Sequence, residues 1–186
     1  MVSMRRRAFV QGAAATTFLF SVAGVEKPLT PAQAYAQGAA LKKLTPEQAD
    51  SLGVFVDALV PGARTAGIAQ FVDHQCSEPP HRALLALRIA NGQPPYVDFY
   101  TKSLAEIDRQ CGSLFGKAFS GLGEADQRAF IDLLRQGKLG DWRGPPQPLV
   151  YNIMREDGVD VVYGTVEGFE RLGVPYMAHV LPTARW

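Results

Sequence analysis

The sequence predicts an all-α fold: a single compact bundle of about five to six short helices with an irregular, Gly- and Pro-rich C-terminal third. Apolar residues recur three and four positions apart in several stretches, the spacing of one face of a helix. The 13 Pro and 18 Gly among 186 residues divide these stretches into short pieces. Strand-like alternation is nearly absent, and residues 159–163 form the one short run of β character.

The first helix of the bundle has the clearest start signal. Thr45 can cap the helix, Pro46 suits its first turn, and Gln48 completes a capping box. Apolar residues then follow at helical spacing as far as the dipeptide Pro61-Gly62, which we expect to end the helix.

Later helices are predicted from the same apolar spacing between breaks. We expect them over residues 68–76, 84–89, 97–111, 124–136 and 149–156. Residues 137–148, rich in Gly and Pro, read as a surface loop. Trp142 in this loop has two interpretations, packing on the protein's own core or contact with a partner. Glycines at 164, 168 and 173 suggest close backbone packing in the final segment.

The N-terminus has the pattern of an export signal. Three arginines at 5–7 precede a run without charged residues, and small residues follow at Ala34 and Ala36, where cleavage is expected. Arg6 and Arg7, with Phe9, resemble the twin-arginine signal. We therefore divide the chain into a signal peptide, 1–36, and a helical domain, 37–186, and we expect export to the periplasm. A basic tail is the alternative interpretation.

The charge balance excludes a dedicated nucleic-acid binder. Lys and Arg total 19 against 18 Asp and Glu, and the densest basic run lies in the predicted signal. Removing that signal takes away four basic residues and one acidic residue, which leaves a slightly anionic domain. Neutralising phosphates requires the opposite charge balance.

No recognisable catalytic motif is present, so we assign no catalytic, cofactor-binding or metal-binding residue. The sequence lacks a glycine-rich phosphate loop, a nucleophile-elbow serine, a His-Glu-x-x-His pair and a haem-attachment motif. The alternative interpretation is a metal site or a stand-alone enzyme. It would use His74 and His81 with the two cysteines and nearby acidic residues, although their spacing is irregular for zinc.

Cys76 and Cys111 are predicted to form a disulfide. Both survive removal of the signal, and the periplasm is oxidising. Closing this loop would stabilise the fold by roughly 3–4 kcal/mol in the chain-entropy model. Two buried free thiols or a metal site remain as alternatives.

Three features together resemble the gluconate 2-dehydrogenase subunit 3 family. They are the twin-arginine signal, the segments Leu44–Glu47, Asp57–Gly62 and Gly67–Asp73, and the C-terminal Tyr163–Thr165 with Gly168-Phe169 and Leu172–Pro175. The family's usual Tyr-Gly-Gly-Asn and following Trp are replaced here by Thr165, Val166 and Phe169.

The resemblance implies a non-catalytic small (gamma) subunit without a cofactor of its own. Its partners would be an FAD-dependent dehydrogenase of the glucose-methanol-choline type, a multihaem cytochrome c and the twin-arginine translocase, in a complex held at the inner membrane. The small subunit would supply the export signal and stabilise the catalytic subunit. A free-standing structural domain is a further alternative. Aromatic residues expected at the interface are Trp142, Tyr151, Tyr163, Phe169, Tyr176 and Trp186.

Overall fold

The computed structural model describes residues 17–174. The export-signal residues Arg6, Arg7 and Phe9, and the interface candidates Tyr176 and Trp186, lie outside these described residues. Within them the chain is mostly helical, which confirms the all-α prediction, with eight α-helices and one small two-stranded sheet in place of five to six helices alone.

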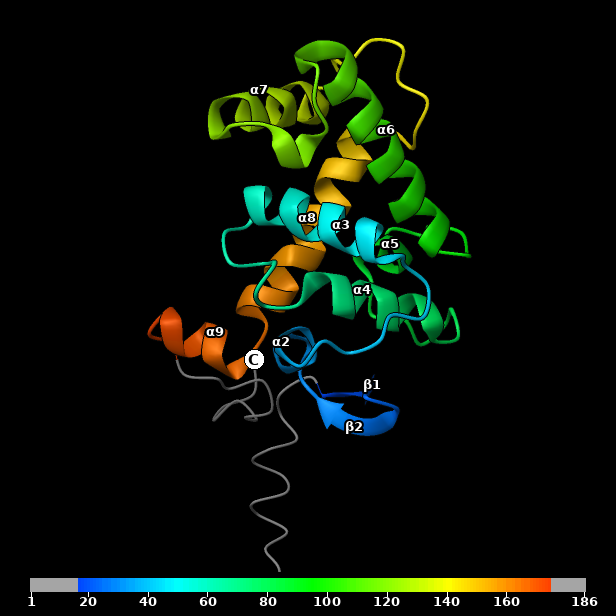
Figure 1. The fold of residues 1–186 in the computed structure, drawn as a ribbon, viewed down its shortest axis with the longest axis vertical. Helices are drawn as coiled ribbons and strands as arrows, with labels where there is room; N and C mark the ends of the chain where they lie inside the picture. Colours follow the sequence, from blue (N-terminus) through cyan, green and yellow to red (C-terminus); the bar gives the residue numbers. More distant parts are fainter. Residues whose placement is uncertain (1–16, 175–186) are drawn as a thin grey trace, which may run out of the picture.

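The elements follow one another with short connections (Figure 1). In chain order they are β1 (Phe18–Val22), β2 (Val25–Leu29), α2 (Pro31–Ala36), α3 (Pro46–Leu59), α4 (Ile68–Ser77), α5 (Ala86–Ile89), α6 (Val97–Phe115), the 3₁₀ turn η1 (Phe119–Gly121), α7 (Glu124–Arg135), α8 (Gln147–Tyr163) and α9 (Val166–Arg171). Among the described helices, none is long and apolar enough to cross a bilayer.

Helices α3 and α8 form the centre of the bundle. Helix α3 packs against α4, α6, α7 and α8, while α8 also contacts α4, α5, α7 and α9. The predicted start of α3 is confirmed, because Thr45 and Gln48 exchange both capping-box hydrogen bonds and Pro46 occupies the first turn. A single continuous apolar core joins α3 and α8 to the helices around them.

The prediction of β character for residues 159–163 is wrong, because these residues form the end of α8. Val161 and Val162 lie buried there against the core. Gly158 permits this packing, since a Cβ at that position would lie 2.6 Å from Cγ1 of Val56 on α3. The close approach of two helices outweighs the weak helix propensity of valine and glycine. Of the described part of the C-terminal third, residues 147–163 and 166–171 are therefore helical, whereas residues 137–146 form a loop.

A β-hairpin and a short helix lie within the segment predicted as leader. Strands β1 and β2 pair antiparallel in the register Phe18↔Leu29, joined by a turn at Ala23-Gly24 with φ of 50° and 79°. Apolar side chains Phe20, Leu29, Ala34 and Ala39 form a small second core between the hairpin and α2. Sequence reasoning missed this hairpin because it treated the apolar run as an export signal.

Candidate partner-binding surface

The most deeply buried carboxyl group, Asp157, holds helices together. Its Oδ2 accepts a hydrogen bond of 2.6 Å from the Tyr100 hydroxyl of α6, and its Oδ1 accepts one of 2.9 Å from the Ala86 N–H. Ala86 begins α5, which has no capping side chain of its own, so Asp157 supplies the missing acceptor. Burial raises the pKa of Asp157 to about 7. Both carboxylate oxygens therefore accept hydrogen bonds within the fold, and the side chain is closed off from solvent.

A second carboxylate, Asp73 on α4, fixes the loop before α3. It accepts three backbone N–H groups, those of Lys42 at 2.8 Å, Lys43 at 2.7 Å and Leu44 at 2.8 Å. A carboxylate saturated by backbone donors has few lone pairs left for catalysis or metal binding. Its place in the family-like segment Gly67–Asp73 is therefore explained by loop anchoring.

The loop 137–148 docks on α6 through Glu106. This carboxylate pairs with Arg109 at 2.6 Å and accepts the backbone N–H of Arg143 at 3.0 Å. The hydrogen bond from the Arg109 guanidinium is the main reason that the pKa of Glu106 falls to about 2. Trp142 packs half-buried on the core and donates its indole N–H to the Pro145 carbonyl at 2.6 Å. The structure thus favours internal packing for this tryptophan.

The predicted Cys76–Cys111 disulfide is not formed, and both residues are free thiols. Cys76 lies near the C-terminal end of α4, whereas Cys111 lies in the C-terminal half of α6. A disulfide requires Cα atoms within about 7 Å. Burial raises the pKa of both thiols to about 12, so they are protonated, unreactive core groups.

The two histidines do not come together around a common centre. His74 lies buried on α4 with its ring 4.8 Å from that of Phe18 and 5.3 Å from that of Phe20, and burial lowers its pKa. His81 is exposed in the loop after α4. Over residues 17–174 no group of three or more His, Cys, Asp or Glu side chains could hold a metal ion. The alternative of a site built on His74 and His81 has no supporting geometry.

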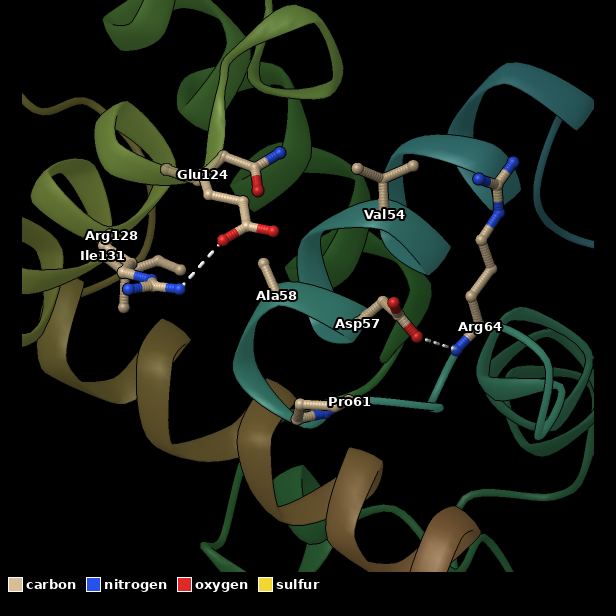
Figure 2. A pocket seen from close by; sticks show the side chains of 9 residues that line it. Val54, Asp57, Ala58, Pro61, Arg64, Glu124, Arg128 and Ile131 are labelled. Carbon is tan, nitrogen blue, oxygen red and sulfur yellow. Dashed lines mark hydrogen bonds and ion pairs between the residues drawn. The ribbon is translucent and has the colours of Figure 1, made fainter.

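A groove of about 420 Å³ lies between α3 and α7, next to the family-like segment Asp57–Gly62 (Figure 2). Oδ1 of Asp57 accepts the backbone N–H groups of Gly62 at 3.1 Å and Arg64 at 3.0 Å, so this carboxylate shapes the turn after α3. On the other wall Glu124 pairs with Arg128 at 2.9 Å. Neither a histidine nor a cysteine lines the groove, and Arg64 on its wall pairs with Asp50.

The hairpin, α2 and α9 lie at the lower end of the molecule in Figure 1, and several exposed apolar side chains belong to these elements or to loops beside them. Leu84 lines a hollow of about 310 Å³ with Leu19 of the hairpin and a second, of about 190 Å³, with the end of α8. Leu84 therefore connects the two sides of this surface. We call this surface the hairpin–α9 face and define it by Leu19, Val25, Tyr35, Leu84, Leu172 and Val174.

Two of the predicted interface aromatics lie toward this face. Tyr163 ends α8 and packs half-buried on the core, and Phe169 lies in α9. Tyr151 packs in the first half of α8, where the Arg155 guanidinium lies 5.6 Å from its ring centre. Sequence reasoning missed Leu19 and Leu84, because a leucine that packing leaves exposed has the same sequence pattern as one that it buries.

Comparison with known proteins agrees with the sequence resemblance. Curated proteins and solved structures give no significant match. A family model described as gluconate 2-dehydrogenase subunit 3 matches residues 33–179, which include every helix from α3 to α9. The chain belongs to the gluconate 2-dehydrogenase subunit 3 family.

Proposed function

We propose that this protein is the non-catalytic small subunit of a periplasmic FAD-dependent dehydrogenase complex acting on gluconate or a related sugar or alcohol. It supplies the twin-arginine signal for a catalytic flavoprotein that has none, and it stabilises that flavoprotein. A multihaem cytochrome c would complete the complex and hold it at the inner membrane. The observation that carries this proposal is the family match over residues 33–179.

The chemistry of the described residues supports an accessory role. The buried carboxylates Asp73, Glu106 and Asp157 all bind backbone N–H groups, and each of them joins separate parts of the fold. Buried polar groups that are fully satisfied in this way stabilise a structure. Catalytic groups need an open route to a substrate, and none of these three has one.

The hairpin–α9 face is the surface that we expect the flavoprotein to cover. Stable interfaces have apolar centres with aromatic residues, and this face combines exposed leucines and valines with Tyr163 and Phe169 nearby. Leu172 and Leu84 represent the two sides of this face, and 56% and 45% of their surfaces are exposed.

Export is tested by co-expressing the protein with a candidate partner flavoprotein that lacks a signal of its own, followed by fractionation and affinity capture. With Arg6 and Arg7 intact we expect both chains in the periplasm in equal amounts. The double substitution Arg6→Lys, Arg7→Lys should retain both in the cytoplasm, because the signal requires the arginine pair. Periplasmic flavoprotein in the absence of this subunit would contradict the escort role.

The interface is tested separately with purified chains. Leu172→Glu and Leu84→Glu place a charge at the hairpin–α9 face and should weaken flavoprotein binding at least tenfold, since a buried unpaired charge costs more than about 1.4 kcal/mol. Leu114→Glu is the matched control, as Leu114 is 51% exposed on α6, away from this face. Equal binding by all three variants would exclude this surface while leaving the export role open.

A further inference from the structure

The N-terminal segment 18–36 contacts α4 at several independent points. The Phe18 ring centre lies 6.1 Å from that of Phe71 and 4.8 Å from that of His74, and the Phe20 ring centre lies 5.3 Å from the same imidazole. Phe20 is itself buried beneath α2. The hairpin therefore covers a surface of α4 that would otherwise be apolar and open to water.

Helix α2 fits against α4 through a glycine. Gly67 precedes α4 with φ of +82°, and a Cβ at this position would lie 2.1 Å from the Pro31 carbonyl oxygen at the start of α2. Helix α2 has a complete capping box between Thr30 and Gln33, and its Ala34 is fully buried. The domain thus has a site shaped for this helix.

Residues before and after the predicted cleavage positions are also hydrogen-bonded to one another. The Ala40 N–H donates to the Ser21 carbonyl of β1 at 2.8 Å, and the Ala39 N–H donates to the Ala34 carbonyl at 2.9 Å. A few residues later the chain enters the loop that Asp73 fixes by three hydrogen bonds. Cutting after Ala34 or Ala36 would separate the hairpin and α2 from these partners.

We propose that residues 18–36 are a permanent part of the folded domain, and that the exported protein keeps the hairpin and α2. Any processing of the export signal then lies before Phe18. A peptidase binds its substrate as an extended chain, and cleavage concentrates at exposed, unstructured positions. Ala34 and Ala36 instead belong to a capped helix docked on the domain, so the folded chain protects the bonds that follow them. The twin-arginine route carries folded proteins, so this protection exists before export.

The test on the purified full-length chain needs neither export nor a partner. A leader peptidase with small-residue specificity is incubated with the native chain and with a synthetic peptide of residues 26–44. We expect cleavage after Ala34 or Ala36 in the peptide and at least a hundredfold slower cleavage in the native chain. Native cleavage at the peptide's rate would overturn the proposal.

A variant pair tests whether α2 docking provides the protection. Gly67→Ala places a methyl group against the Pro31 carbonyl and should release α2, raising the cleavage rate at least tenfold. Gly116→Ala is the matched control, because Gly116 has a similar φ of +73° with nothing within 4 Å of the added Cβ. Equal resistance of both variants would overturn the role given to α2.

The mass of the exported wild-type chain gives an independent readout, and this readout alone rests on the proposed export. We expect an N-terminus at Phe18 or earlier. A chain that begins at Tyr35 or Gln37 would overturn the proposal even if both variants failed to fold. Failure of export would count against the proposed function, while the peptidase experiment would still decide this inference.

Discussion

Replacing Asp157 with Asn should make the stability of the protein less dependent on pH. Asp157 is 1% exposed and its pKa is raised from 3.8 to about 7, chiefly by burial. The folded state therefore binds this proton more tightly than the unfolded state. Stability conferred by the protonated carboxyl is complete below pH 3.8 and is lost as pH rises through about 7.

The size of the effect follows from the shift. The rise of the Asp157 pKa from 3.8 to about 7 corresponds to about 4 kcal/mol of unfolding free energy, of which about 3 kcal/mol is lost between pH 4.5 and 8. Asn keeps both contacts, since its oxygen can accept the Ala86 N–H and its amide can donate to the Tyr100 hydroxyl. The Asp157→Asn variant should thus gain about 3 kcal/mol relative to the wild type over this range.

Urea unfolding at several pH values measures this difference, because groups that titrate identically in the two proteins cancel. Asp160→Asn is the matched control. It removes the same charge from a more exposed position on α8, where partial burial also raises the pKa of the carboxyl, so we expect a smaller change with pH than for Asp157→Asn. A stability difference for Asp157→Asn that stays constant from pH 4.5 to 8 would refute the reasoning. So would an equal change in the Asp160 variant.

Three further outcomes follow from the packing. Gly158→Ala should destabilise the fold by about 1–3 kcal/mol, because the added methyl group meets Val56. In a double-mutant cycle, adding Val56→Ala should recover at least about 1 kcal/mol of this loss. Additive effects of the two substitutions would contradict this contact. Thiol titration without reductant should detect both Cys76 and Cys111 in the denatured protein and find them slow to react in the native protein. Denatured protein without free thiols would indicate a disulfide. Glu106→Gln should lower the free energy of unfolding by about 2–3 kcal/mol at pH 7. This difference should shrink as pH falls below 4.5 toward 2, where the wild-type carboxylate is itself protonated. A difference in urea unfolding that is unchanged at pH 3 would exclude the ionised pair.

Local signals in the sequence predicted the helices that begin with a cap or end at a glycine. Thr45 and Gln48 mark the start of α3, and Gly137, with φ of +67°, follows the end of α7. These signals depend on backbone groups within a few residues of the helix end, so they can be recognised without the rest of the fold. The family resemblance was likewise carried by short segments whose order along the chain is fixed.

Contacts between distant residues could not be predicted in this way. Residues 159–163 have strand propensity, yet Gly158 brings them against α3 and they continue α8. The cysteines satisfied every compositional condition for a disulfide, yet they lie on different helices, α4 and α6, and both are free thiols.

The sequence by itself determined the helical class, the main helix starts and stops, the absence of familiar catalytic motifs and the family. The tertiary structure decided which carboxylates serve the backbone, which apolar side chains stay exposed at the hairpin–α9 face, and that residues 18–36 pack on α4. The physical reason is that caps and breaks act over one helical turn, whereas burial and exposure depend on residues tens of positions away.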